Sequence, residues 1–308
     1  MGLVEGGSGE MSWIQEFVQR DLLQSGTNSC TGCGSALGLR TALRVLGERT
    51  ILVIPANCTA AIQGPYPNSA FKVPALNVAF AAAAAVASGL DAALKVRDME
   101  DVNVVVWAGD GGTADIGLQA LSGAAQRESN MIYICYDNEG YMNTGIQESG
   151  ATPYGAWTTN SPRGKSGVKK DIPLIMMEHG IPYVATACAS YPADYIQKLR
   201  KAMHHKGLKY IQLLSPCPPG WRFKASETVL VGKLAVETGM WALFEIEDGK
   251  FSLTGPSVNL ANPERRKPLD DYLRVQERFR GMTPEDVAVL KKSVDDSWRK
   301  YMRLCDMS

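Results

Sequence analysis

The sequence is short of histidine, has no excess charge of either sign and contains no long uninterrupted run of hydrophobic residues. Its 308 residues include 32 Lys and Arg, 32 Asp and Glu, and three histidines. A formal net charge of zero leaves no basic footprint, so we expect no nucleic-acid partner. The longest apolar stretch, 73–90, is dominated by alanine and interrupted by Asn77, Ser88 and Gly89. This composition favours a buried helix over a membrane span.

The first ten residues also lack the basic and apolar regions of a signal peptide, since Glu5 and Glu10 are their only charged members. We therefore expect a cytoplasmic protein with no membrane association. Hydrophobic residues make up 45% of the chain and charged residues 21%, as in ordinary globular proteins. The few histidines lie in polar, helix-like contexts and are expected to be surface residues: His179, His204 and His205.

Apolar runs alternate with helical patterns along most of the chain, which predicts an α/β fold with a parallel sheet and helices on both faces. Past residue 225 the alternation weakens. We expect an α/β domain over 1–225 and a C-terminal arm over 226–308, packed on the same domain or on a partner subunit. Strands are expected over 50–55, 103–108, 131–136, 183–187 and 209–214. Helices are expected over 12–23, 36–46, 77–96, 115–127, 173–179, 192–205 and 284–304.

The most informative stretch is 104–115, where a β-branched run ends in a glycine turn and a helical pattern begins. In this arrangement a parallel-sheet strand presents a phosphate to the N-terminus of a helix. Asp110 lies inside the turn, where its carboxylate would repel a bare phosphate but could hold a divalent metal next to it. Asn138 ends the next apolar run and is placed to be a second oxygen ligand, because ligands bind at the carboxyl ends of parallel strands.

Two other interpretations of the turn remain open. Residues 109–114 also fit the dinucleotide pattern G-x-G-x-x-A, with Asp137 where an acidic ribose ligand is expected, or the turn is purely structural. Asp110 and Asp115 stand against a dinucleotide, because both place negative charge near the phosphate, whereas Mg²⁺ prefers oxygen ligands. Asn143 follows in a long loop and either reaches a substrate or caps a turn.

Four of the seven cysteines have spacing suited to a metal site. Cys30 and Cys33 form a C-x-x-C on a Thr-Gly turn, and Cys58 and Cys217 each follow an expected strand. Four thiolates of this kind suit an iron–sulfur cluster or zinc. The alternative is a redox C-x-x-C with two unrelated cysteines. The other three have no ligand-like setting, and the first is expected in the core: Cys135, Cys188 and Cys305.

With these residues in view, the chain resembles the beta subunits of the thiamine diphosphate-dependent 2-oxoacid:ferredoxin oxidoreductases. The resemblance covers most of residues 27–225, and the C-terminal arm matches more loosely. The matching segments are Cys-Thr-Gly-Cys-Gly at 30–34, Ala-Ala-Ala-Val-Ala-Ser-Gly at 83–89, Gly-Asp-Gly-Gly-Thr-Ala-Asp-Ile-Gly at 109–117, Tyr-Asp-Asn-Glu at 136–139, Tyr-Met-Asn-Thr-Gly at 141–145, Thr-Pro-Tyr-Gly-Ala at 152–156 and Ser-Pro-Cys at 215–217.

The resemblance implies a thiamine diphosphate-binding fold and a set of site residues. Magnesium would be held by the side chains of Asp110 and Asn138 and the carbonyl oxygen of Gly140, and Asn143 would face the reacting carbon. One [4Fe–4S] cluster close to the thiamine would accept the electrons and pass them to ferredoxin. The residues implied at the diphosphate are Gly109, Gly111, Gly112 and Thr113, and those at the cluster are Cys30, Cys33, Cys58 and Cys217.

The resemblance also implies partner chains. Thiamine catalysis needs a glutamate at the aminopyrimidine ring, which the family supplies from another subunit. This chain is therefore expected to hold half of an active site and to work only with alpha-, gamma- or delta-type subunits and ferredoxin.

Departures from the family pattern bear on the substrate. Pyruvate-using relatives have Phe-Glu-Asn-Ala-Ala where this chain has Phe-Ala-Ala-Ala-Ala at 80–84, and the loop 64–74 differs as well. Two polar groups are lost, which favours oxalate as substrate, with pyruvate next. The alternatives are an NAD-dependent dehydrogenase and a non-catalytic iron–sulfur electron-transfer subunit.

Overall fold

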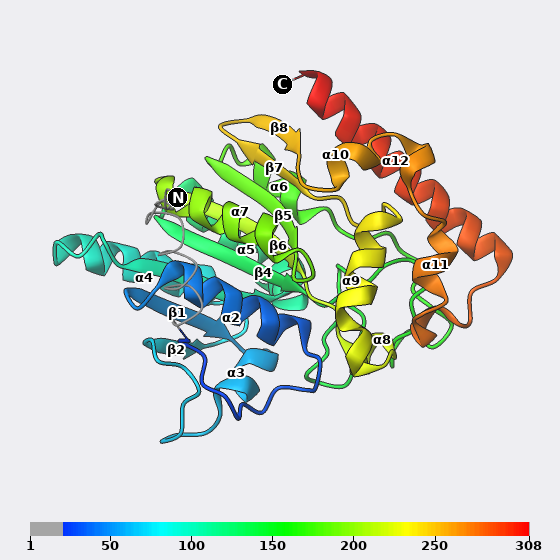
Figure 1. Cartoon of the computed structure of the whole chain (residues 1–308). Helices are drawn as coiled ribbons and strands as arrows, with labels where there is room; N and C mark the ends of the chain where they lie inside the picture. The colour runs from blue at the N-terminus through cyan, green and yellow to red at the C-terminus, as the bar shows by residue number, and fades with distance from the viewer. Residues whose placement is uncertain (1–20, 308) are drawn as a thin grey trace, which may run out of the picture.

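An eight-stranded sheet forms the centre of the computed structural model, which describes residues 21–307 (Figure 1). The strand order is β2-β1-β3-β4-β6-β5-β7-β8. The first six strands in this order pair in parallel, and β7 pairs antiparallel with both β5 and β8. The strands are β1 Thr50–Pro55, β2 Ala75–Val78, β3 Asn103–Gly109, β4 Met131–Asp137, β5 Tyr183–Cys188, β6 Leu208–Leu214, β7 Phe244–Glu247 and β8 Lys250–Leu253.

Helices cover both faces of the sheet, with α2 and α7 in front and α4 and α5 behind in the view of Figure 1. The predicted α/β fold with a mostly parallel sheet is confirmed. The helices and helical turns are α2 Gly34–Leu46, α3 Cys58–Gln63, α4 Ala83–Val96, η1 Gly112–Ile116, α5 Leu118–Gln126, α6 Ile172–Glu178, α7 Pro192–His204, α8 Pro218–Trp221, η2 Ala225–Glu227, α9 Thr228–Glu237, α10 Ser257–Leu260, η3 Pro263–Arg265, α11 Leu269–Leu273, η4 Glu277–Phe279 and α12 Pro284–Met307.

Strand β3 shows why its sequence is almost continuously apolar. Val104 and Val106 point into the core between the sheet and α4 and α5, whereas Val105 and Trp107 point into the core between the sheet and α2 and α7. Both faces of the strand are therefore buried, as in parallel sheets that carry helices on both sides.

Two expected elements differ from the sequence interpretation. The helix predicted over 77–96 begins only at Ala83, because 75–78 forms β2 and pairs with β1. The helix predicted over 115–127 is split into the π-helical turn η1 and α5. The helix predicted over 12–23 falls mostly outside the described residues.

The segment after residue 225 extends the sheet as well as forming the C-terminal helix α12. Strands β7 and β8 were not expected, since each has only four residues. Tyr301 of α12 packs against Phe244 and Phe251, which fixes the helix to this edge of the sheet. The division into domains at residue 225 stays a prediction. Within residues 21–307, no helix is long and apolar enough to cross a membrane.

Candidate active site at the carboxyl edge of the sheet

The loops that follow β3 and β4 bring Asp110 and Asn138 together. The two strands are neighbours, with Gly109 paired to Tyr136, so the residues that follow them meet at one edge. The Asn138 backbone N–H donates a hydrogen bond of 3.2 Å to Asp110 Oδ1, and both residues are buried. The proximity expected from the strand order is therefore present.

Three oxygen atoms converge beside this contact. Asn138 Oδ1 lies 2.8 Å from Asp110 Oδ1 and 3.0 Å from the carbonyl oxygen of Gly140. An octahedral Mg²⁺ site places neighbouring ligand oxygens about 2.9 Å apart, since each lies at about 2.0–2.1 Å from the metal. Three acceptors facing one another are unfavourable without a cation or a donor. The alternative is an Asn138 amide rotated by 180°, whose NH₂ would donate to both oxygens.

The surroundings of Asp110 are also those of a carboxylate that lacks a cationic contact. Burial and the nearby Asp137 charge raise the pKa of Asp110 well above its usual value, and the Ser149 hydroxyl, by hydrogen bonding, and the more distant charge of Lys169 only partly oppose this. Ser149 Oγ donates to Asp110 Oδ2 over 2.5 Å. Within residues 21–307 no lysine or arginine is ion-paired with Asp110. A divalent cation would offset this buried negative charge.

The glycine turn lines a cavity of about 140 Å³ at the same edge. Side-chain bulk is excluded there, because a Cβ on Gly111 would lie 2.4 Å from the Tyr141 ring and one on Gly112 would lie 2.9 Å from the Phe80 ring. The lining residues are Ala56, Asn57, Cys58, Phe80, Gly109, Gly111, Gly112, Tyr136, Asn138, Gly140, Tyr141, Met142, Asn143 and Thr144.

Thr113 does not present its side chain to this cavity. It is fully buried, and its hydroxyl donates to the Gly109 carbonyl over 2.8 Å and lies 3.2 Å from the Tyr133 hydroxyl. The Thr113 side chain therefore stabilises the turn from inside the core. Only the Thr113 backbone could contact a group bound in the cavity.

The four cysteines with metal-like spacing border a second cavity of about 250 Å³. Cys33 caps α2, Cys58 is the first residue of α3 and Cys217 caps α8, while Cys30 lies on the exposed side of the turn. Burial and the charges of the neighbouring thiolates raise the pKa of Cys58 to about 11 and that of Cys217 to about 12. The four thiols are therefore close enough to influence one another.

The spacing of the thiols does not match a single ion. Over residues 21–307, no group of three or more His, Cys, Asp or Glu side chains is placed to hold one metal ion. Cys135 lies in the core within β4, as expected, and Cys188 is buried as well.

The two cavities share a wall. Its residues line both spaces and are Cys58, Asn138, Met142 and Asn143. Asn143 is exposed, and its side chain makes no hydrogen bond to another described residue. Capping of a turn by Asn143 is therefore not observed among the described residues, and its role toward a bound molecule stays a prediction.

Three residues at the site carried no signal in the sequence. Ser149 is one serine in a loop rich in serine and threonine. Lys169 and Arg278 form ion pairs with Glu139, next to Asn138, from 30 and 139 positions further along the chain. No local pattern reveals contacts of that separation.

Comparison with known proteins agrees with these features. Residues 57–213 match the family model of the thiamine pyrophosphate enzyme C-terminal TPP-binding domain. The chain is 53% identical over 285 residues to pyruvate synthase subunit PorB of Methanothermobacter thermautotrophicus, covering 91% of this chain and 97% of that protein. It is 47% identical over 294 residues to ketoisovalerate oxidoreductase subunit VorB of Pyrococcus abyssi, covering 92% and 93%.

A solved structure shares the fold. The 2-oxoglutarate:ferredoxin oxidoreductase of Magnetococcus marinus aligns with a TM-score of 0.57 and 24% identity, over 69% of this chain and 79% of that chain.

Proposed function

This chain belongs to the beta subunits of the thiamine diphosphate-dependent 2-oxoacid:ferredoxin oxidoreductases, and we propose that its two adjoining cavities hold magnesium–thiamine diphosphate and one [4Fe–4S] cluster. The observation that supports the proposal is the shared wall, because an electron donor bound in the first cavity would lie directly beside an acceptor bound in the second.

The first cavity is the cofactor site. Asp110, Asn138 and the Gly140 carbonyl would hold Mg²⁺, with the Asn138 amide turned so that its oxygen occupies the position 2.8 Å from Asp110 Oδ1 and 3.0 Å from the Gly140 carbonyl oxygen. The turn glycines leave room for the diphosphate to approach the backbone. When bound, thiamine diphosphate supplies the nucleophilic carbon and the electron sink for oxidative decarboxylation of a 2-oxoacid. Asn143 would face the reacting carbon and orient the substrate.

The second cavity is the cluster site. Cys30, Cys33, Cys58 and Cys217 would each bind one iron, which suits thiols spread around a cavity better than a single zinc ion does. Because burial raises the pKa of the Cys58 and Cys217 thiols, loading the cluster would release protons from them.

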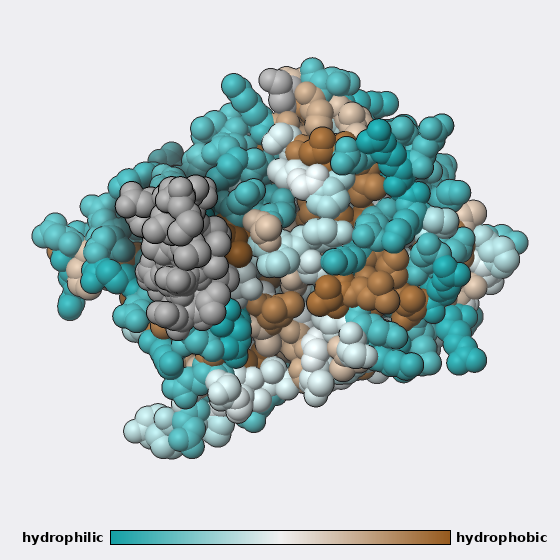
Figure 2. Space-filling model, in the orientation of Figure 1, coloured by the Kyte–Doolittle hydropathy of each residue, from teal (hydrophilic) through white to brown (hydrophobic). Residues whose placement is uncertain are grey.

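The active site is completed by another chain. Among the described residues, no glutamate lines the cofactor cavity, so the acid needed at the aminopyrimidine ring must come from a partner subunit. Ile116, the last residue of the helical turn η1 that follows the glycine turn, is 49% exposed. Figure 2 shows hydrophobic surface gathered where α9 lies in Figure 1, and Val229 and Leu230 of α9 are 46% and 49% exposed. These surfaces are suited to subunit contacts.

We propose pyruvate or a branched 2-oxoacid as substrate. Ala56, Phe80 and Met142 give the cofactor cavity apolar walls, and no lysine or arginine of the described residues lines it. An uncharged side chain fits these walls better than a dianion does. Oxalate stays a prediction that would require cations from the partner chain.

The test is dye reduction by the anaerobically purified complex of this chain with its co-expressed partner subunits. We expect viologen reduction with pyruvate or 2-oxoisovalerate in the presence of coenzyme A, and none from this chain alone. Oxalate-dependent, coenzyme A-independent reduction would replace the substrate proposal. Reduction of NAD instead of the dye, or stoichiometric zinc in place of iron, would overturn the proposed chemistry.

A further inference from the structure

We propose that Lys169 and Arg278 form a cationic clamp on Glu139, and that this clamp sets the geometry of the magnesium ligands Asn138 and Gly140. The inference rests on the proposed function and deepens it: these two residues position the metal site without touching the metal. Arg278 lies in the C-terminal segment, outside the region 57–213 that matches the cofactor-binding domain.

The conformation of Glu139 explains why a clamp is needed. Glu139 has a φ of +63°, a left-handed conformation that a residue with a Cβ rarely adopts. Glu139 connects the two proposed ligand residues, and the Asn138 side-chain amide lies 3.0 Å from the Gly140 carbonyl oxygen. An unfavourable conformation of this kind persists only when the surrounding structure holds it in place.

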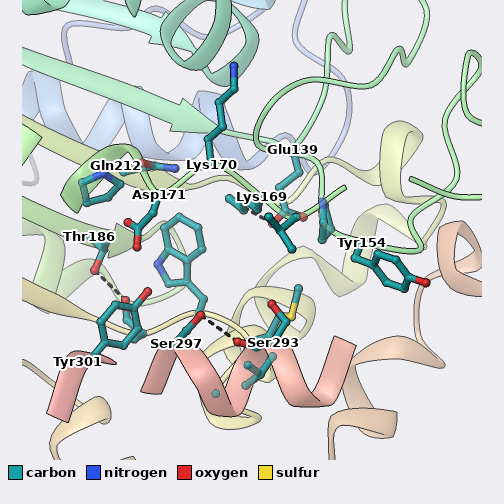
Figure 3. A pocket seen from close by; sticks show the side chains of 18 of the residues that line it. Glu139, Tyr154, Lys169, Lys170, Asp171, Thr186, Gln212, Ser293, Ser297 and Tyr301 are labelled. Carbon is teal, nitrogen blue, oxygen red and sulfur yellow. Dashed lines mark hydrogen bonds and ion pairs between the residues drawn. The ribbon is translucent and has the colours of Figure 1, made fainter. Parts of the chain in front are cut away.

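The side chain of Glu139 is held at both oxygens. Oε1 lies 3.0 Å from Lys169 Nζ and Oε2 lies 2.7 Å from an Arg278 terminal nitrogen. Side-chain exposure is 2% for both Glu139 and Arg278. Figure 3 shows Glu139 and Lys169 side by side on the wall of a cavity distinct from the two described above. A carboxylate this deeply buried requires its cationic partners.

The backbone on either side of Glu139 is fixed as well. The Thr152 hydroxyl donates to the Glu139 carbonyl over 2.8 Å, and Trp221 Nε1 donates to the Asn138 carbonyl over 2.7 Å. Trp221 belongs to the short helix α8 that follows Cys217. The metal-ligand segment and the cluster loop therefore share one anchoring side chain.

Three further contacts orient the Arg278 side chain toward Glu139. Its Nε donates to Gln276 over 3.0 Å, a terminal nitrogen donates to the Tyr272 hydroxyl over 3.0 Å, and the guanidinium lies 3.9 Å above the Trp221 ring. These contacts come from α11, from the residue that precedes η4 and from α8. Lys169 also pairs with Asp137 over 2.7 Å, which ties the clamp to the end of β4.

Two accounts of this network make different predictions. If it only stabilises the fold, loss of Arg278 lowers the melting temperature and leaves the metal affinity alone. If it positions the ligands, loss of Arg278 weakens Mg²⁺ binding, and replacing Glu139 by glycine removes the need for the clamp. Glycine adopts positive φ freely and leaves no buried carboxylate.

The experiment measures Mg²⁺ affinity in the complex with partner subunits, stripped of metal and cofactor, by titrating Mg²⁺ and following thiamine diphosphate binding by tryptophan fluorescence. For Arg278→Met we expect an apparent Kd for Mg²⁺ that is at least tenfold higher than that of the wild type, with kcat largely restored at saturating Mg²⁺. Arg278→Lys should lie between this variant and wild type. The double variant Glu139→Gly, Arg278→Met should bind Mg²⁺ as tightly as Glu139→Gly alone.

A matched control is Arg266→Met, because Arg266 stacks on Trp298 at 4.1 Å in the same C-terminal segment. It should lower stability without changing Mg²⁺ affinity. The clamp proposal is wrong if Arg278→Met binds Mg²⁺ with wild-type affinity, or if the double variant binds Mg²⁺ as weakly as Arg278→Met does. If Arg278→Met does not fold, the Mg²⁺ affinity of Arg278→Lys is compared with that of Glu139→Gly. Weaker Mg²⁺ binding by Arg278→Lys supports the positioning account, and equal affinity supports the account in which the network only stabilises the fold. A wild-type complex that binds neither Mg²⁺ nor thiamine diphosphate would overturn the proposed function itself.

Discussion

Met142 lies directly against Gly220, so closely that a Cβ on Gly220 would stand 2.2 Å from the Met142 sulfur. The same Cβ would be 3.2 Å from Cys217 Sγ. Met142 lines both cavities, and Gly220 belongs to the helix that follows Cys217. The wall between the cofactor and cluster cavities therefore depends on the absence of a side chain at residue 220.

Gly220→Ala is expected to displace Met142 and the Cys217 loop. Overpacking costs about 1–3 kcal/mol of stability, and we expect the lower end because the flexible Met142 side chain can move away; displacement of the Cys217 thiol should reduce the iron content of the purified complex. Denaturant unfolding and iron analysis measure the two effects. Gly89→Ala is the control, since a Cβ there meets no atom within 4 Å and the residue lies within α4. It should be neutral or stabilising. A Gly220→Ala complex with full iron content would show that the wall tolerates the methyl group.

Asp110→Asn should abolish the stabilisation that Mg²⁺ and thiamine diphosphate give to the complex. A ligand at one hundred times its Kd adds about 2.7 kcal/mol, so EDTA should lower the melting temperature of the wild type and leave that of the variant unchanged. Asp91→Asn serves as a matched control, because Asp91 is a buried carboxylate paired with Lys95 away from the site. It should retain the response to EDTA. A persistent EDTA effect in Asp110→Asn would exclude Asp110 as a ligand.

Cys58→Ser should remove the broad visible absorbance that dithionite bleaches in an iron–sulfur protein. Cys135→Ser should keep it, because Cys135 is buried in β4 and faces neither cavity. Spectra of the two anaerobically purified complexes provide the comparison. Equal absorbance in both variants would argue against Cys58 as a cluster ligand.

Stability should rise with pH above neutrality through Lys209. The residue is 4% exposed, its Nζ donates to Asn130 over 2.6 Å, and burial lowers its pKa from 10.5 to about 8. Between these two values the unfolded chain binds the extra proton, so the free energy of unfolding increases with pH. Below pH 8 the folded state carries the full penalty, roughly 3 kcal/mol at about 1.4 kcal/mol per pKa unit.

Lys209→Met should therefore be more stable than wild type at pH 7, and the difference should shrink toward pH 10.5. Urea unfolding at several pH values measures it. Lys291→Met is the control, because Lys291 is exposed on α12 and is not among the groups that shift the pKa of Lys209. Its curve should run parallel to that of the wild type. A Lys209→Met curve that also runs parallel would refute the assignment.

The sequence alone predicts those parts of the fold and the site that are determined by segments close together along the chain. Asp110 and Asn138 follow consecutive strands that are also adjacent in the sheet, so their spacing along the chain predicts their proximity in space. The cysteine set was found because two of its members are close in sequence. Ligand identity is a separate question, and the roles of Asn143, the cysteines and the magnesium ligands stay predictions.

Other features depend on contacts that local patterns do not encode. Strand β2 lies next to an alanine-rich stretch that favours helix, and pairing with β1 decides its conformation. Strands β7 and β8 are short and acquire their stability from the edge formed by β5. The hydroxyl of Thr113 points into the core because the turn carbonyl needs a donor, a detail that the phosphate-binding pattern leaves open.

The ion pair between Glu139 and Arg278 also constrains the order of events during biosynthesis. A nascent chain that has emerged only through β6 contains Asp110, Asn138 and three of the four candidate cluster cysteines, with Cys217 still to follow. At that stage Lys169 is the only one of the two clamp cations present to pair with Glu139. Stable insertion of the metal and the cofactor is therefore expected to await synthesis of the segment that carries Arg278.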